Sequence, residues 1–364
     1  MKITHYHLQC YRLPYHREVV WANATEHAGT YAVLALCDDQ GVWGVAEGTL
    51  KARWSGVSAR SVMAALEDVL LPALQEAPFA GVAGARARLA GIPENRLAKA
   101  MIDSALWQIE AQHAQQPLWQ YLGARTPEVS LTWALTRQAP TQMANEAERM
   151  CARYGFKTLK VKGGQGLETD LAALAAIRQA VGEAVYLYVD ANSAYPTQEA
   201  LSYVQALHAA GVGVAEDPVP IQPDADFTQL QARSPLPILV DRRCASVDDA
   251  RALIACGAKA LSTKPGRIGV SEARDIGTLC AGAGVQVAVG LYAESALGTL
   301  VSLQYAASVP WAQRLVSAEL TFYLELQAQV TDDLPQIIDG HIRLPDNTHL
   351  AAAIDWARVA RFAI

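Results

Sequence analysis

The sequence predicts an α/β fold in which a TIM-type β/α barrel follows a smaller α+β domain. From residue 129 onward, short apolar runs alternate with Ala- and Leu-rich helical stretches at a period of about 25–30 residues, the size of one βα unit. Eight such runs within about 200 residues fit an eight-stranded barrel. A doubly wound sheet is the alternative, but it needs fewer strands and gives no reason for eight repeats. The runs cover residues 129–135, 158–162, 185–190, 212–216, 237–241, 260–264, 285–290 and 315–319.

The first part of the chain, residues 1–125, has a different pattern. Residues 5–13 and 30–37 alternate or run apolar like β-strands, and Asp38-Asp39-Gln40-Gly41 has the composition of a hairpin turn before a third strand over 42–46. Apolar residues at helical spacing follow and predict helices over 58–71 and 96–122. Strands followed by helices are typical of an α+β domain, which would cap the barrel.

The last part of the chain lies outside the eight βα units. The barrel is expected to occupy residues 126–326, and the helix after its seventh strand is expected around 296–307. Residues 327–364 contain two more strand-like pieces, within 335–342. We expect this C-terminal segment to return to the capping domain and complete it.

The composition is that of a soluble enzyme with a large core, since 51% of the 364 residues are hydrophobic and 18% are charged. The net charge of −6 and the absence of a Lys/Arg-rich run argue against nucleic acid or an anionic membrane as a partner. No apolar stretch approaches the ~20 residues that span a bilayer. The N-terminus turns polar at Lys2 without a secretory apolar segment, so we expect a cytoplasmic protein. The six cysteines form no C-x-x-C pair and the histidines no H-x-x-x-H pair, which predicts reduced thiols and no zinc site.

Acidic residues close three consecutive runs of the predicted barrel: Asp190, Glu216 and Asp241. In β/α barrels the active site forms at the C-terminal ends of the strands. Neighbouring parallel strands lie ~4.8 Å apart, so these carboxylates could converge on one cation. Hard oxygen ligands are those that Mg²⁺ prefers. The alternative is that the acids form salt bridges that only hold the barrel rim together.

Lysines bracket these acids. Lys160 and Lys162 are two residues apart, so in a strand both point to the barrel interior. Crowding of two ammonium groups, together with desolvation, can bring a lysine pKa towards the working pH. Lys264 ends a run on the other side of the acids, so a substrate held at a metal would meet one lysine on each face. Strand-end lysines that are merely solvated are the alternative. The arrangement indicates acid–base chemistry by lysines on a substrate held at a metal.

Several short motifs surround these residues: Lys160-Val161-Lys162, Asp190-Ala191-Asn192, Glu216-Asp217-Pro218, Asp241, Lys264-Pro265-Gly266-Arg267-Ile268-Gly269 and Glu294-Ser295. Together they resemble the enolase superfamily, and within it the muconate-lactonizing-enzyme subgroup of the mandelate racemase/muconate lactonizing enzyme family. The stretch 41–47 resembles the Gly-Trp-Gly-Glu hairpin of that family's capping domain. The resemblance covers nearly the whole chain.

The resemblance implies a role for each of these residues. Asp190, Glu216 and Asp241 would bind Mg²⁺, with Mn²⁺ as an alternative, and the metal would hold the carboxylate of a small-molecule substrate. Lys162 and Lys264 would be the acid–base pair around a metal-stabilised enediolate. Lys160 would tune Lys162 and contact the carboxylate. The resemblance also implies a homo-oligomer.

Residues 15–29 are expected to form a loop over the barrel mouth that helps to select the substrate. The alternative for its aromatic residues is ordinary loop packing. The expected substrate contacts, in this loop and elsewhere, are Tyr15, Trp21, His27, Trp54, Asn192, Glu294 and Glu319.

The sequence departs from the family pattern at several points. Arg242 follows Asp241 where the family usually has an acid, and we expect its side chain to point away from the face of Asp241. Pro265 fixes the backbone after Lys264. The family's Pro-Asp-Gly-Pro-Gly-Leu stretch reads Pro345-Asp346-Asn347-Thr348-His349-Leu350. No histidine follows the seventh run, which argues against the mandelate-racemase subgroup.

The eighth run bears on the substrate. Dipeptide epimerases carry an Asp-x-Asp pair there, whereas this sequence has Glu319-Leu320-Thr321, closer to the Glu-Leu-Phe of muconate cycloisomerases. We therefore expect cycloisomerisation of an unsaturated dicarboxylate. Racemisation or epimerisation of an amino-acid derivative and dehydration of a carboxylate are the alternatives. A non-catalytic binding barrel is disfavoured by the intact set of acids and lysines.

Overall fold

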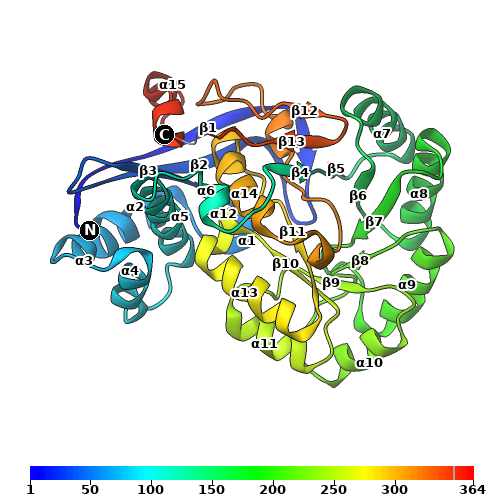
Figure 1. Cartoon of the computed structure of the whole chain (residues 1–364). Helices are drawn as coiled ribbons and strands as arrows, with labels where there is room; N and C mark the ends of the chain where they lie inside the picture. The colour runs from blue at the N-terminus through cyan, green and yellow to red at the C-terminus, as the bar shows by residue number, and fades with distance from the viewer. Residues whose placement is uncertain (347–348) are drawn as a thin grey trace.

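A computed structural model of the chain describes residues 1–346 and 349–364 (Figure 1). Within them, seven parallel strands form one sheet in the order β11-β10-β9-β8-β7-β6-β5, so neighbours in sequence are neighbours in the sheet. The strands are β5 (Trp133–Leu135), β6 (Thr158–Lys162), β7 (Tyr186–Asp190), β8 (Ala215–Glu216), β9 (Ile238–Val240), β10 (Ala260–Thr263) and β11 (Gln286–Val289). The predicted TIM-type barrel is confirmed.

Helices alternate with these strands and form the outer layer of the barrel (Figure 1). They are α7 (Pro140–Tyr154), α8 (Leu167–Val181), α9 (Ala200–Ala209), α10 (Ala225–Arg233), α11 (Val247–Ala255), α12 (Pro265–Ile268), α13 (Val270–Ala283) and α14 (Ala296–Ser308), with 3-10 turns η2 (Thr197–Glu199), η3 (Trp311–Gln313) and η4 (Phe322–Glu325). Local sequence sets their ends: Asp224 and Ser246 cap α10 and α11 by accepting backbone N–H groups, and Gly155 ends α7 in the left-handed conformation.

The eighth predicted strand, 315–319, closes the barrel without forming a regular strand. Leu315 N donates to Val287 O (2.9 Å) on one side, and Ala318 N donates to Ser130 O (2.9 Å) on the other. The first predicted run divides between two sheets. Its start, β4 (Glu128–Ser130), pairs antiparallel with β13 (His341–Arg343), and β5 belongs to the barrel sheet. Strand β12 (Ile337–Ile338) pairs on the outer side of β13.

The N-terminal domain is built on the antiparallel strands β1 (Ile3–Val20), β2 (Thr25–Asp38) and β3 (Trp43–Thr49). The predicted turn after β2 is confirmed, since Asp38 N donates to Val42 O (3.1 Å). Its helices are α1 (Ala52–Ser55), α2 (Ala59–Ala64), the π-turn η1 (Ala65–Leu70), α3 (Leu71–Gln75), α4 (Gly81–Ala90), α5 (Arg96–His113) and α6 (Leu118–Tyr121). The helix predicted over 58–71 widens into η1 immediately before Pro72, which cannot donate a backbone hydrogen bond.

The expectation of a loop over residues 15–29 is wrong. These residues form the far end of the β1–β2 hairpin, where Val19 pairs with Glu26 and Val20 with Thr25. The turn itself is short, and Trp21 N donates to Ala24 O (2.8 Å). The register shifts between Pro14 and Val19, which interrupts the regular alternation of the strand.

The C-terminal segment lies against the N-terminal sheet, with η5 (Leu350–Ala353) followed by α15 (Trp356–Arg361) near β1 in Figure 1. Arg12 N donates to Phe362 O (3.0 Å), and Ile364 N donates to Cys10 O (3.1 Å). One apolar cluster joins this segment, the sheet and the barrel helix α14; it includes Tyr31 and Leu297. The unusual Asn347-Thr348 step lies outside the described residues.

Two smaller expectations concern cysteines and membranes. All six cysteines are within the described residues and none is in a disulfide, and Cys151 and Cys256 are only partly buried. Among the described residues, every helix is too short or too polar to cross a bilayer.

Candidate active site

Three acids meet at the C-terminal edge of the barrel sheet. Asp190 ends β7, Glu216 ends β8, and Asp241 directly follows β9. Asp190 and Glu216 are register partners on adjacent strands, which brings their side chains to the same level. Each of the three residues is at most 2% exposed. The sheet order therefore produces the cluster that the sequence predicted.

Lys160 lies beneath these acids. Its Nζ is 2.6 Å from Glu216 Oε2, 2.9 Å from Glu319 Oε2 and 3.1 Å from Asp190 Oδ2, and the residue is 1% exposed. Burial by itself would lower the pKa of Lys160, but the surrounding carboxylates outweigh it and hold that pKa well above its ordinary value. Lys160 is thus a permanent cation that neutralises the cluster from below. The expected contact between Lys160 and a substrate carboxylate stays a prediction.

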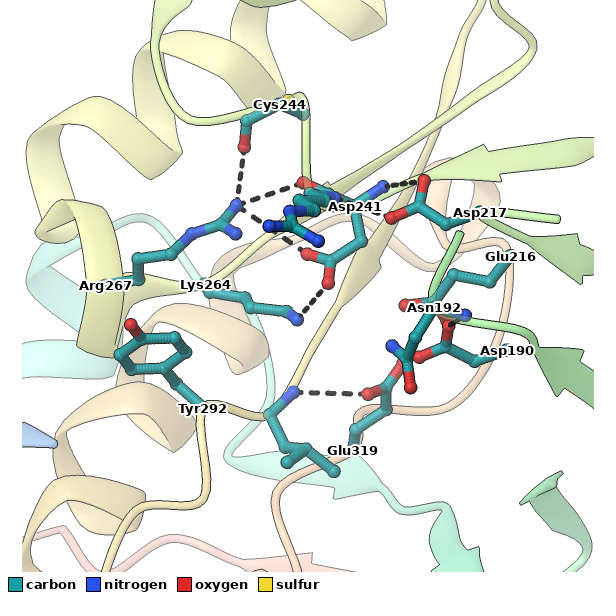
Figure 2. Close-up of polar contacts among 12 residues, drawn as sticks. Asp190, Asn192, Glu216, Asp217, Asp241, Cys244, Lys264, Arg267, Tyr292 and Glu319 are labelled. Carbon is teal, nitrogen blue, oxygen red and sulfur yellow. Dashed lines mark hydrogen bonds and ion pairs between the residues drawn. The ribbon is translucent and has the colours of Figure 1, made fainter. Parts of the chain in front are cut away.

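Lys162 and Lys264 occupy the upper level, on strands separated by β7, β8 and β9. Lys162 Nζ donates to Asp190 Oδ2 (2.5 Å), and Lys264 Nζ donates to Asp241 Oδ2. Figure 2 shows the Asp241 carboxylate between the Lys264 ammonium and the Arg267 guanidinium. Each lysine is therefore held beside one of the acids, from a different side of the cluster.

The electrostatic balance differs between the acids. Burial alone would raise the pKa of Asp241, but Lys264 and Arg267 outweigh it and lower that pKa to about 2. Burial and the nearby Asp190 carboxylate instead raise the pKa of Glu216 well above its ordinary value. Among the described residues, Glu216 has Lys160 as its one ion-pair partner, and it shares that partner with Asp190 and Glu319.

The backbone around the site is strained. Asn192, Asp217 and Ala293 have φ angles of 52°, 37° and 62°, in the left-handed region that side chains other than glycine rarely adopt. The Asp217 carboxylate accepts hydrogen bonds from Asp241 N (3.2 Å) and Arg242 N (2.8 Å), which fixes the end of the next strand (Figure 2). Such residues gather where function requires a particular geometry.

The three acids fit a divalent cation in their chemistry, although their side chains point to the lysines. Among the described residues, no group of three or more His, Cys, Asp or Glu side chains is arranged to hold a metal ion. However, neither carboxylate oxygen of Glu216 accepts a hydrogen bond of good geometry, although Lys160 Nζ lies 2.6 Å from Oε2, and Asp241 Oδ1 accepts none from the described residues. Buried carboxylate oxygens without hydrogen-bond donors are costly, and a hard cation would satisfy them.

One cavity opens above this cluster. Lys162, Asp241 and Lys264 line its floor, and the predicted contacts Asn192, Trp21 and Trp54 also line it. The backbone of Asn192 is fixed by a hydrogen bond from Asn192 N to Asp190 Oδ1 (2.8 Å). The structure therefore brings these three predicted contacts to the candidate site.

The other predicted contacts lie elsewhere. The His27 side chain is 77% exposed and lies 3.5 Å from Glu18, so the expectation that it contacts a substrate does not agree with its position. Tyr15 is buried and packs edge-on against Phe322, as ordinary packing would require. Neither residue lines the cavity.

Glu294 and Glu319 are buried acids beside the cavity rather than in its lining. Glu319 accepts hydrogen bonds from Lys160 and from the Tyr188 hydroxyl, both at 2.9 Å. Glu294 Oε2 accepts a hydrogen bond from Tyr292 N (2.7 Å), and burial raises the pKa of Glu294 to about 7. Both acids lie outside the lining of the cavity, and their contact with a substrate stays a prediction.

Residues of the capping domain that the sequence did not single out also line the cavity. They are Lys51 and Arg53, which follow β3, and Glu26 from β2. Lys51 comes directly after the buried run that ends at Leu50. A charged residue at the end of a buried strand was the signal used for the barrel, and it applies equally to β3.

Comparison with known proteins agrees with this geometry. Residues 142–358 match the family described as "Enolase C-terminal domain-like", and residues 6–123 match "Mandelate racemase / muconate lactonizing enzyme, N-terminal domain". The chain is 33% identical over 233 residues to a hydrophobic dipeptide epimerase of Enterococcus faecalis, a match that spans 63% of this chain and 65% of that protein. It is 29% identical over 330 residues to an o-succinylbenzoate synthase of Geobacillus kaustophilus, which covers 90% of this chain and 86% of that one.

A solved structure extends the similarity to the full length. The muconate lactonizing enzyme of Mycobacterium smegmatis, in complex with muconolactone, superposes with a TM-score of 0.92 at 25% identity and covers 100% of both chains. The similar proteins thus carry out several different reactions on one fold.

Proposed function

Because the chain belongs to the mandelate racemase/muconate lactonizing enzyme family of the enolase superfamily, whose members are isomerases, epimerases and lyases, we propose that it is a Mg²⁺-dependent isomerase. It moves a proton to or from the carbon beside a carboxylate, and its first candidate reaction is a muconate-type cycloisomerisation. The observation that carries this proposal is the pair Lys162 and Lys264, which line one cavity from strands on either side of the acid cluster.

Asp190, Glu216 and Asp241 are the residues that would hold the metal. When bound there, Mg²⁺ supplies positive charge that stabilises negative charge on the substrate carboxylate. Mn²⁺ would serve the same purpose, since the ligands are hard oxygen atoms. The permanent charge of Lys160 adds to this field from below, because it lies within 3.1 Å of Asp190 and 2.6 Å of Glu216.

The two lysines supply the proton transfer. Each is at most 8% exposed, so water is largely excluded from the reacting atoms. Hydrogen bonds to Asp190 and Asp241 hold the amine groups beside the acids at which the carboxylate would be held. In the ring-closing direction Lys162 delivers a proton to the carbon beside that carboxylate, and in the ring-opening direction it removes the proton.

A racemase or epimerase is the second candidate. It requires a base on each face of the carbon, and the positions of Lys162 and Lys264 on opposite sides of the cluster favour it. A cycloisomerase needs only one of them for proton transfer. The two candidates therefore differ in how much the second lysine matters.

The test is incubation with Mg²⁺ in deuterated buffer, with muconolactone and with N-acyl amino acids and dipeptides as substrates. Ring opening of muconolactone, with solvent deuterium exchanged into the carbon beside the carboxylate of the remaining lactone, supports the cycloisomerase, whereas deuterium uptake with loss of optical activity supports the racemase. Loss of water would indicate a dehydratase instead. Lys162→Ala should reduce the rate by at least about 10³-fold, and Lys157→Ala, which removes an exposed lysine at the other end of β6, should not. Full activity of Lys162→Ala, or activity that persists after complete removal of divalent metal, would refute the proposal.

A further inference from the structure

We propose that Lys51, Arg53 and Arg242 form an anion-binding subsite at the outer end of the cavity. The substrate would then carry a second negative charge, far from the carboxylate held near Lys162 and Lys264. This inference rests on the proposed function, because the first carboxylate defines which end of the cavity is the reacting end.

Lys51 is the innermost residue of this subsite. It lines the same cavity as the catalytic lysines, and its side chain is only 11% exposed. Its ammonium lies 2.5 Å from Glu26 Oε2, 3.4 Å from the Tyr15 hydroxyl and 4.6 Å from the centre of the Trp21 ring. An ammonium has three N–H donors, and Glu26 and Tyr15 account for two of them. One donor is therefore left for a ligand in the cavity.

Glu26 does not make this end of the cavity acidic. Its Oε2 accepts hydrogen bonds from both Lys51 and Trp21 Nε1 (2.8 Å), so its charge is already compensated. A substrate ammonium would have to displace Lys51 to reach it. Burial of Lys51 beside Glu26 instead gives a neutral pair that presents an N–H donor.

Two further cations give the subsite its net charge. Arg53 lines the cavity with an exposed side chain, and the Arg242 guanidinium stacks 4.6 Å from the ring of Trp54, which also lines it. Within the described part of the chain, neither guanidinium has a carboxylate partner in an ion pair. With Lys51 balanced by Glu26, both arginine charges are available to an anion.

Indole rings form part of the cavity wall. Trp21 and Trp54 line it together with the catalytic lysines. The Trp21 ring lies 4.6 Å from the Lys51 ammonium, and the Trp54 ring lies 4.6 Å from the Arg242 guanidinium. Such walls favour an apolar or unsaturated spacer between the two charged groups. The substrate class that fits is a dicarboxylate, or another carboxylate with an anionic group at its far end.

The test is direct binding of three unreactive probes of equal chain length to the Mg²⁺-loaded protein, measured by calorimetry. Hexanoate, adipate and ε-aminohexanoate share one carboxylate and differ only in the group at the other end. A charge-assisted hydrogen bond contributes about 1.5–3 kcal/mol, so adipate should bind about 10–100-fold more tightly than hexanoate, and ε-aminohexanoate should bind least tightly.

Variants of the subsite residues, and of Glu26, test which side chains produce the preference for adipate. Lys51→Met should reduce the preference for adipate over hexanoate by about tenfold, and Arg53→Gln and Arg242→Gln by smaller factors because they are exposed. Glu26→Gln should increase the preference, since it removes the carboxylate that pairs with Lys51 while retaining an acceptor for Trp21. If the Lys51–Glu26 pair had a purely structural role, Lys51→Met and Glu26→Gln would change the preference in the same direction. The matched control is Lys157→Met, which should leave the preference unchanged.

The outcomes separate the two proposals. Equal binding of the three probes, or tighter binding of ε-aminohexanoate, would overturn the anion subsite and leave the proposed function standing. Absence of binding by all three would count against the common carboxylate site, and thus against both proposals. If Lys51→Met does not fold, the neutral double variant Glu26→Gln/Lys51→Met and the two surface arginine variants give the same comparison. An unchanged preference in all of these would overturn the subsite.

Discussion

The buried ammonium of Lys160 should be essential to the stability of the metal-free protein. Lys160→Met keeps a long apolar side chain and removes only the charge, so the barrel packing is largely preserved. Removing one partner from a buried ion pair costs about 3–5 kcal/mol, because the remaining charge is left uncompensated. We expect the free energy of unfolding to fall by about this amount.

The structure indicates which acid is responsible for the loss. After the substitution, Asp190 still accepts a hydrogen bond from Lys162 (2.5 Å), and Glu319 still accepts one from the Tyr188 hydroxyl (2.9 Å). Glu216 has no such replacement, since neither of its carboxylate oxygens accepts a hydrogen bond. The double variant Lys160→Met/Glu216→Gln should therefore recover more than half of the lost stability.

Urea unfolding followed by circular dichroism, at neutral pH with a chelator present, measures both effects. Lys157→Met is the control, because it removes an exposed lysine from the other end of the same strand and should change stability by less than about 0.5 kcal/mol. A loss below about 1 kcal/mol for Lys160→Met would refute the reasoning. So would a double variant that is no more stable than the single one.

Three further substitutions probe the walls of the site. In Gly290→Ala the new Cβ would lie 2.5 Å from Lys264 Cε, so the flexible lysine side chain must move. We expect kcat to fall by up to about 10²-fold with little change in the urea midpoint. An unchanged kcat would count against a role of Lys264 in proton transfer. Burial raises the pKa of Glu294 to about 7, so the folded state holds a proton that the unfolded state releases near pH 4.5. The free energy of unfolding should therefore decline by on the order of 3 kcal/mol as the pH rises from about 4.5 to 7. Glu294→Gln should abolish this decline, as measured by urea unfolding at pH 5 and pH 8. Ser295→Ala removes the hydroxyl that donates to the buried Glu47 carboxylate. The free energy of unfolding, measured by urea unfolding, should fall by about 1.5–3 kcal/mol. An unchanged free energy would mean that the other donors to Glu47 compensate its charge.

The positions of the acids could be predicted from sequence because they depend on one regular feature. In a parallel barrel every strand ends at the same edge, so a charged residue that closes a buried run must lie there. Asp190, Glu216 and Asp241 follow this rule. The register between β7 and β8 then pairs Asp190 with Glu216 directly. The positions of these acids thus follow from the strands alone and do not depend on the conformation of the loops.

The depth of a residue within the barrel could not be predicted in this way. Alternation places Lys160 and Lys162 on one face, but a strand rises by about 3.3 Å per residue, so Lys160 lies almost 7 Å lower. At that level it meets Glu216 and Glu319 and is 1% exposed. The same difference in depth removes Glu319 from the cavity. The predicted contact between Glu319 and a substrate stays a prediction, and the structure shows Glu319 in a buried ion pair with Lys160.

The hairpin end over 15–29 was missed for a different reason. Strand pairing there depends on backbone hydrogen bonds, while the side chains include His16, Arg17 and Glu18 and the register shifts after Pro14. Without alternation of apolar and polar residues, a strand has no periodic signal in its sequence. Pairing with β2, together with an isolated bridge between Tyr15 and Leu326, holds the segment in its extended conformation.

The contrast between the two ends of the cavity follows from these points. The reacting end is made by consecutive strands of one sheet, so a single sequence pattern contains it. The outer end combines Lys51 and Arg53 after β3, Glu26 on β2, and Arg242 after β9, which only the packing of the capping domain on the barrel brings together. The barrel alone therefore contains the signal for proton transfer, whereas the proposed anion subsite depends on contacts between the two domains. Arg242 stands where the family usually has an acid. In the proposed subsite it adds positive charge to the outer end of the cavity, while Asp241 stays paired with Lys264.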